Sequence, residues 1–198
     1  MTEGHEVILR DRSAVLIRQI RSEDAPLLAD GFDRLSPRSR QLRFLRAKDK
    51  LTPAELRYLT DVDHHDHEAL AALDRSDGRG VGIARYIRDA DDPQAAEIAV
   101  TIVDDWQGKG LGTELLARLS DRARHEGIRR FTALVSSDNV PMTRLLRKMR
   151  ARRVGYGPGT EEYLIALWSR KDQVATALCT PLGSNCVLPK GAICQARR

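Results

Sequence analysis

Cysteine is scarce in this chain of 198 residues, and its placement is uneven. The three cysteines, Cys179, Cys186 and Cys194, lie together near the C-terminus with a C-x6-C-x7-C spacing. This spacing does not match a zinc site, and an odd number of cysteines does not close into a disulfide framework. We therefore predict free thiols in an extension, with an intermolecular disulfide or an oxidation site as the alternative.

Long hydrophobic runs are also lacking. No stretch approaches the roughly 20 apolar residues of a membrane span. The N-terminal MTEGHEVILRDRSAVLI contains acidic residues and no uninterrupted apolar region, so it does not resemble a signal peptide. With 41% apolar and 31% charged residues, the composition is that of an ordinary globular protein. We predict a cytoplasmic protein with no membrane partner and one main domain.

A concentrated basic face is not expected, although the net charge is +5. Residues 170–198 hold five lysines and arginines against Asp172, so four of the five net charges lie there and residues 1–169 are left near +1. Sequence-independent binding to nucleic acid needs clustered cations. We therefore predict no nucleic-acid partner.

Histidines are few except in the stretch DVDHHDHE at 61–68, which makes a metal site one interpretation. However, His64, His65 and His67 lack the i, i+4 spacing of the zinc-protease motif. The interpretation we favour is a polar loop that leads into a strand, and we predict no metal site.

Hydrophobic periodicity and turn residues predict a chain of alternating strands and helices after an N-terminal extension at 1–13. A domain at 14–168 is expected, followed by a basic, cysteine-containing tail at 169–198. The helices are expected to begin at Ser22, at Ser36-Pro37, at Thr52 with a capping box to Glu55, near Leu111, and at Asp138 or Asn139. The strands are expected at 14–20, 68–74, 80–88, 96–103, 128–135, 152–156 and 161–168.

The helix that follows Asn139 carries an apolar stripe at helical spacing. We predict that this stripe packs into the core. Its members are Met142, Leu145, Leu146 and Met149.

The stretch at 94–127, QAAEIAVTIVDDWQGKGLGTELLARLSDRARHEG, changes from a period of 2 to a period of about 3.6. The change brackets a turn that contains Gly108, Gly110 and Gly112, where the main chain can approach a bulky anion closely. The first amides of the following helix have no partner inside the helix and favour a phosphate group. The glycine spacing fits neither a P-loop nor a dinucleotide fingerprint.

In the strand before the loop, alternation places Glu97, Ala99, Thr101 and Val103 opposite Ile98, Val100 and Ile102. If Glu97 stands in a cleft wall, it could take a proton from an ammonium group or a water. The alternative is a solvent-facing glutamate with no chemical role.

Gln107-Gly108-Lys109-Gly110-Leu111-Gly112 resembles the Q/R-x-x-G-x-G/A coenzyme A signature of the GCN5-related N-acetyltransferases, the GNAT superfamily. Together, AEIAVTIVDDWQGKGLGTELL and RFTALVSSDNVPM resemble the catalytic domain of bacterial Pat-type protein lysine acetyltransferases. The resemblance covers roughly residues 12–168. It implies an α/β (α+β) GNAT fold, with a mixed, mostly antiparallel sheet of six to seven strands flanked by helices.

The same resemblance implies a site. Acetyl-CoA would be the cosubstrate, Glu97 the general base, and direct transfer in a ternary complex the mechanism. A tyrosine that protonates the thiolate in many relatives has no counterpart in the helix after Asn139, so Tyr156 or Tyr163 would have to replace it or none would act. The residues implied to bind acetyl-CoA are Ala99, Thr101, Val103, Gln107, Gly108, Lys109, Gly110, Leu111, Gly112, Thr113 and Asn139.

Three functions are compatible with these features. The first is acetylation of an exposed protein lysine, with acyl-CoA synthetases favoured as substrates by resemblance. The others are acetylation of a small amine and non-catalytic binding of an acyl-CoA. The arginine-rich segment at 38–46 is either a solvated basic face or a substrate-side wall for an acidic protein surface. The sequence leaves the acceptor, the acyl-chain preference and the oligomeric state open.

Overall fold

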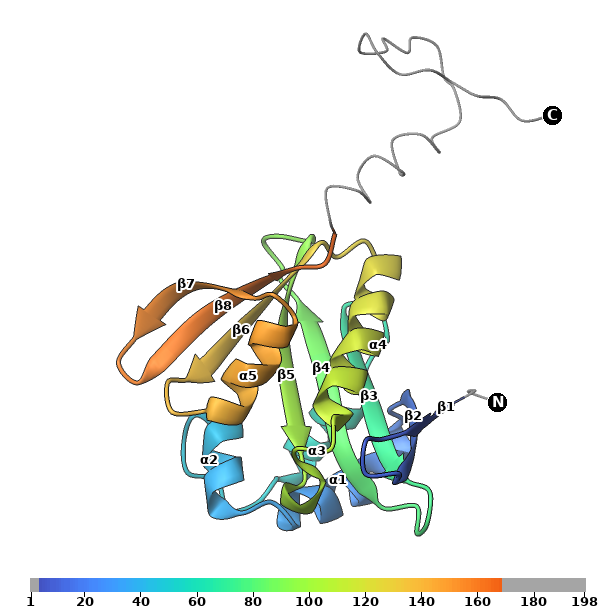
Figure 1. Cartoon of the computed structure of the whole chain (residues 1–198). Helices are drawn as coiled ribbons and strands as arrows, with labels where there is room; N and C mark the ends of the chain where they lie inside the picture. The colour runs from blue at the N-terminus through green and yellow to red at the C-terminus, as the bar shows by residue number, and fades with distance from the viewer. Residues whose placement is uncertain (1–3, 169–198) are drawn as a thin grey trace, which may run out of the picture. The chain divides into compact units, whose positions relative to one another are not determined.

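The computed structural model describes residues 4–168, which are built around one sheet (Figure 1). Within these residues the sheet has eight strands, and all neighbours are antiparallel except the parallel pair β5 and β6. The mixed, mostly antiparallel sheet implied by the resemblance is therefore confirmed. In spatial order the strands are β1 (His5–Ile8), β2 (Ala14–Gln19), β3 (His67–Asp74), β4 (Gly80–Arg88), β5 (Ala95–Ile102), β6 (Arg130–Ser136), β8 (Thr160–Ala166) and β7 (Arg152–Gly157).

Strand β1 raises the number of strands above the expected six to seven, because it lies in the segment predicted as an N-terminal extension. It pairs with β2 from His5 opposite Ile17 to Ile8 opposite Ala14. Its four residues are mostly exposed, so the sequence has no inward-facing apolar alternation there. This edge strand is defined by its backbone pairing rather than by side-chain burial.

Five α-helices accompany the strands in the described part of the chain, and most of their start signals are confirmed. The Ser36 side chain accepts a hydrogen bond from Ser39 N, and Thr52 forms the predicted capping box with Glu55. The segment predicted to be helical from Ser22 starts as a 3-10 turn, Ser22–Asp24, before the first α-helix. The helices are α1 (Ala25–Asp33), α2 (Pro37–Phe44), α3 (Pro53–Thr60), α4 (Leu111–His125) and α5 (Val140–Lys148).

Helices cover both faces of the central strands. A Cβ built on Gly82 of β4 would meet Leu111 and Leu115, so α4 packs closely on this face. On the other face Arg85 of β4 donates a hydrogen bond to the Leu59 carbonyl of α3. Figure 1 accordingly shows α4 in front of the sheet and α1 and α3 behind it.

The register of β4 with β5 settles which side chains of β5 share a face. Ile98, Val100 and Ile102 lie opposite Tyr86, Ala84 and Gly82, and therefore face α4. The second set, Glu97, Ala99 and Thr101, lies opposite Ile87, Arg85 and Ile83, on the face of α1–α3. The predicted alternation of this strand is confirmed.

The pairing of β5 with β6 is short. The ladder joins only Ala95 to Arg130, Ala96 to Phe131 and Glu97 to Thr132. Beyond Glu97 the two strands diverge (Figure 1), which leaves residues 98–102 of β5 without a strand neighbour on that side. The fold therefore opens its sheet immediately after Glu97.

None of the helices among residues 4–168 is long and apolar enough to cross a membrane. The tail cysteines Cys179, Cys186 and Cys194 lie outside the described residues.

Candidate active site

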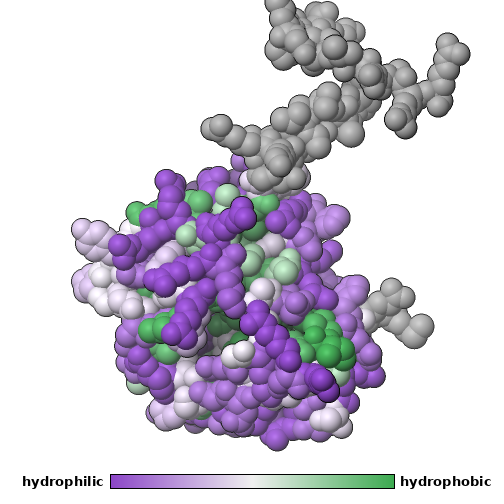
Figure 2. Space-filling model, viewed as in Figure 1, coloured by the Kyte–Doolittle hydropathy of each residue, from purple (hydrophilic) through white to green (hydrophobic). Residues whose placement is uncertain are grey.

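A cleft of about 940 Å³ occupies the gap where β5 and β6 diverge. Its walls are the open edge of β5, the loop before α4, the residues 133–135 of β6, and parts of α2 and α5. Figure 2 shows a hollow on this side of the molecule with a hydrophobic floor and a hydrophilic rim. A cleft of this size and mixed polarity is suited to a large ligand that has both apolar and charged parts.

The glycine loop contributes backbone donors to this cleft. Gly108 and Gly110 have φ angles of 76° and 100°, which residues other than glycine rarely adopt. Within the described part of the chain, the amides of residues 108–112 donate to no protein acceptor. These amides stand at the N-terminus of a 15-residue helix, where the helix dipole favours a negative charge.

Neighbouring elements hold the loop in place. The Gln107 side chain donates to the Ile102 carbonyl at 3.1 Å, and Arg10 N donates to the Lys109 carbonyl at 3.3 Å. A Cβ on Gly112 would lie 3.1 Å from Leu145 Cδ2, so the third glycine allows α4 and α5 to approach each other. The loop is therefore positioned by β5, by the turn after β1 and by α5.

Glu97 lies at the end of the cleft where the β5–β6 ladder stops. Its side chain is exposed, and no described residue forms a hydrogen bond or an ion pair with it. A carboxylate with free acceptor positions at the inner end of a cleft can accept a proton from a group that enters there.

The predicted site residues line this cleft, with two exceptions. Val103 lies after the end of β5, is only 5% exposed and lines a smaller cavity that adjoins the cleft on the face of α1–α3. Lys109 points to Asp11, 3.0 Å away, and lies over the Trp106 ring. The sequence could not show either placement, because it depends on where β5 ends and on how the turn after β1 folds against the loop.

Asn139, at the start of α5, has two roles available. Its Oδ1 accepts a hydrogen bond from Met142 N at 3.1 Å, which caps the helix as predicted. The residue also lines the cleft, and no described residue accepts a hydrogen bond from its side-chain Nδ2. The side-chain oxygen therefore fixes the orientation of the side chain, while Nδ2 remains available as a donor.

The apolar stripe of α5 is not purely core, contrary to the prediction. Leu146 is fully buried, but Met142 and Leu145 line the cleft. Because α5 stands beside the opening between β5 and β6, one side of its stripe faces the cleft instead of the sheet. A 3.6-residue period identifies an apolar face but not what covers it.

Helix α2 forms a wall of the cleft, supplied by Ser39, Leu42 and Arg43. Asp104, directly after β5, accepts hydrogen bonds from the backbone and side chain of Ser36 and from the Ser39 hydroxyl. Burial would raise the pKa of Asp104, but these hydrogen bonds outweigh it and hold the pKa below its ordinary value. The segment at 38–46 is therefore partly a cleft wall, and Asp104, 65 positions after Ser39, holds it in place.

Neither tyrosine considered as a proton donor lines the cleft. The Tyr163 hydroxyl donates to Glu161 at 2.5 Å, and Tyr156 is 89% exposed on β7. Both belong to the β7–β8 hairpin. The described part of the chain therefore places no tyrosine in the cleft.

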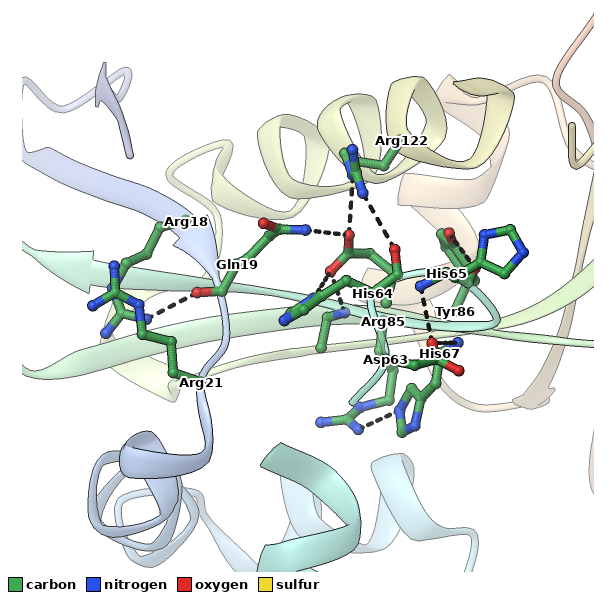
Figure 3. A network of polar contacts seen from close by, with 12 residues as sticks. Arg18, Gln19, Arg21, Asp63, His64, His65, His67, Arg85, Tyr86 and Arg122 are labelled. Carbon is green, nitrogen blue, oxygen red and sulfur yellow. Dashed lines mark hydrogen bonds and ion pairs between the residues drawn. The ribbon is translucent and has the colours of Figure 1, made fainter. Parts of the chain in front are cut away.

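The histidine-rich stretch lies elsewhere, around the buried carboxylate of Glu68 (Figure 3). Glu68 Oε1 lies 2.8 Å from His64 Nδ1, and Arg122 Nε donates to Oε2 at 3.0 Å. Gln19 donates to the same Oε2. This network joins β2, β3 and α4, and no group of three or more potential metal ligands is arranged to hold an ion within residues 4–168.

Comparison with known proteins agrees with this geometry. Acetyltransferase PA5475 of Pseudomonas aeruginosa is 41% identical over 136 residues, which are 68% of this chain and 73% of that protein. Acetyltransferase Pat of Mycolicibacterium smegmatis is 35% identical over 102 residues, or 52% of this chain but only 31% of that protein. The solved GNAT domain of S. lividans PAT has a TM-score of 0.78 and 27% identity, with 82% of this chain and 96% of that chain covered.

The model of the acetyltransferase (GNAT) family matches residues 35–150, which include the open edge of β5, the glycine loop and the start of α5. The chain thus belongs to the GNAT family and is an acetyltransferase whose cosubstrate is acetyl-CoA.

Proposed function

We propose that this enzyme transfers the acetyl group of acetyl-CoA to the side-chain amine of a protein lysine, with Glu97 as general base. The observation that carries the proposal is the position of Glu97 at the last β5–β6 pair, where the open strand edge begins. An extended reactant bound along this edge would have its inner end beside Glu97.

The loop and the strand edge would bind different parts of the cosubstrate. The free amides of residues 108–112 suit the diphosphate. The pantetheine amides would pair with residues 98–102 as an added strand, since this edge has no strand neighbour. Gln107, Thr113 and Asn139 would add polar contacts along the cleft. This arrangement directs the thioester towards Glu97.

The transfer then proceeds within the ternary complex. Glu97, directly or through a water, takes a proton from the incoming ammonium group, and the neutral nitrogen attacks the thioester carbon. The N–C bond forms, the C–S bond breaks, and the electron pair of that bond leaves with sulfur. The second proton of the nitrogen is lost as the amide forms, and the thiolate is protonated from water. A thiol has a pKa of about 8.5, so its anion leaves without an obligatory acid.

A protein acceptor is supported by the shape and charge of the cleft and by similarity to Pat acetyltransferases. The rim carries Arg46, Arg144 and Lys148, which suit an acidic protein surface. An acyl-CoA synthetase is the acceptor we favour, and the cytoplasm is the location we propose. Acetylation of a small amine is the second candidate, because an open cleft also admits small molecules.

The test compares acceptors under one set of conditions. Purified enzyme is given acetyl-CoA with an acyl-CoA synthetase, with unrelated lysine-rich proteins, or with a panel of small amines. Thiol release is followed, and acetyl-lysine is located by mass spectrometry. Acetylation of one synthetase lysine at a kcat/KM well above that of the other acceptors supports the proposal. Efficient turnover of a small amine, with proteins unmodified, would replace it with the second candidate.

A further inference from the structure

Two arginines stand together on the Glu97 face of the sheet, and neither has an anionic partner among residues 4–168. Arg85 projects from β4 and is only 4% exposed, while Arg43 projects from α2 and is half-buried. Both line a cavity of about 80 Å³ between α1, α2, α3 and the sheet. The cavity and the large cleft share Arg43, Phe44 and Thr101 as lining residues, so the two spaces adjoin each other there.

The hydrogen bonds of Arg85 go to neutral acceptors. Nη2 donates to the Leu59 carbonyl at 3.1 Å, and Nη1 lies 3.0 Å from His67 Nε2 (Figure 3). Burial, assisted by the Arg85 charge, lowers the pKa of His67 to about 4, so the imidazole is neutral and accepts this bond. Arg85 therefore keeps its full positive charge uncompensated.

Arg43 is also without a carboxylate partner among the described residues. Its guanidinium lies 5.1 Å from the ring centroid of Phe44. Glu97 acts on Arg43 only through its longer-range field, because no ion pair joins the two. The carboxylate that lines the cavity is Asp24, which accepts hydrogen bonds from Arg18 at 2.6 and 2.7 Å.

Two desolvated cations next to each other disfavour the charged state of both. Burial, followed by the charge of Arg43, lowers the pKa of Arg85 to about 9. Burial likewise lowers the pKa of Arg43, against the opposing field of Glu97. Buried charges in proteins are usually paired, so an unpaired pair of guanidinium groups beside a reaction centre indicates a missing anion.

We propose that Arg43 and Arg85 form a carboxylate-binding site beside Glu97, which selects a reactant that carries a carboxylate near the reacting carbon or nitrogen. The proposal rests on the function proposed above and specifies its substrate. A planar guanidinium matches a carboxylate in a two-pronged geometry. The mainly apolar walls of the cavity suit the methylene groups that would accompany it.

The carboxylate has two possible sources, and both present the same chemistry to the arginines. It can belong to the acceptor, as an aspartate or glutamate beside the target lysine. It can also belong to the acyl group, as in a thioester of a dicarboxylic acid such as succinyl-CoA. Combining each donor with each acceptor distinguishes the sources.

The experiment measures kcat/KM for acetyl-CoA and succinyl-CoA with two lysine peptides that differ only by glutamate or glutamine beside the lysine. We expect the wild type to prefer one carboxylate-bearing reactant by about tenfold to a hundredfold, as for a hydrogen bond to a charged group. Arg43→Gln should reduce this preference to about twofold or less, mainly through the KM of the carboxylate-bearing reactant. Arg43→Lys, which retains the charge but loses the two-pronged geometry, should give an intermediate preference.

Arg57→Gln is the matched control, because Arg57 is exposed on the neighbouring helix α3 and lines neither space. The same loss of preference in this variant would show a general effect of charge and would overturn the proposal. Equal kcat/KM for all reactants in the wild type would also overturn it, as would an equal loss for all reactants in Arg43→Gln. These outcomes do not depend on Glu97, whose role is tested by its own variant.

Discussion

Replacement of Glu97 by glutamine tests the proposed base with little disturbance to the fold. The side chain is exposed and makes no hydrogen bond or ion pair with any described residue. Glutamine has nearly the same size and shape, so the free energy of unfolding should change by less than about 0.5 kcal/mol. Binding of acetyl-CoA should also be retained, because the loop amides are untouched.

The catalytic loss should be large by comparison. A positioned general base contributes a factor of about 10² to 10⁴ to the rate. At 1.36 kcal/mol for each tenfold change, this corresponds to about 3 to 5 kcal/mol of transition-state stabilisation. The assay is thiol release at saturating acetyl-CoA with the best acceptor found, and the expected change is a fall in kcat and in kcat/KM with acetyl-CoA affinity retained.

Glu162→Gln provides the matched control, because Glu162 is an exposed strand glutamate on β8 that does not line the cleft. This variant should keep wild-type kinetics. A folded Glu97→Gln enzyme with kcat within threefold of the wild type would refute the general-base role. In that case the deprotonated amine would have to come from solution.

Three further changes test how the site is supported. Gly108→Ala and Gly78→Ala replace glycines that have φ of 76° and 75° and open space around them, so backbone strain should lower the stability of each variant to thermal unfolding by about 1–2 kcal/mol. Only Gly108→Ala should weaken the binding of acetyl-CoA in a titration. Equal affinities of the two variants for acetyl-CoA would argue against binding by the loop. Asp104→Ala removes the carboxylate that accepts the hydrogen bonds of Ser36 and Ser39, which should destabilise the fold by about 1–2 kcal/mol and raise the KM of the amine substrate. An unchanged KM would show that α2 does not contribute to binding of the amine substrate. Asp24→Asn leaves Arg18 buried without its partner and should cost about 3 kcal/mol in urea unfolding at pH 7. Burial would raise the pKa of Asp24, but the hydrogen bonds from Arg18 and the Arg21 amide outweigh this and lower the pKa. The difference in the free energy of unfolding between wild type and Asp24→Asn should therefore stay constant above pH 3.8 and shrink as the pH falls further. A constant difference down to pH 2 would contradict this.

The glycine loop illustrates how far local sequence information reaches. Residues 94–127 change hydrophobic period within a few positions, and a strand, a turn and a helix follow at those places. Start signals such as Ser36, Thr52 with Glu55, and Asn139 act through atoms within three residues, so they too could be predicted. Strand β1 was missed because its side chains carry no burial pattern.

The candidate site was predictable only where it follows the chain continuously. The alternation of β5 placed Glu97 and Ala99 on one face, and the structure agrees. Val103 and Lys109 were assigned to the site by the same continuity, yet β5 ends before Val103 and Asp11 turns Lys109 aside. A motif defines which residues are adjacent in sequence, and it does not fix the direction of each side chain.

By itself, the sequence determined the order of most strands and helices, the glycine loop and the carboxylate placed before it, because these depend on period, capping and backbone freedom over a few residues. Only the tertiary structure decided where the sheet opens, since the length of the β5–β6 ladder depends on packing between distant segments. It also decided that α2 closes the cleft through Asp104, and that Arg43 and Arg85 meet beside Glu97. Such meetings are long-range because each residue contributes a side chain from a different element, and no local pattern specifies the partner across 40 to 70 positions of chain.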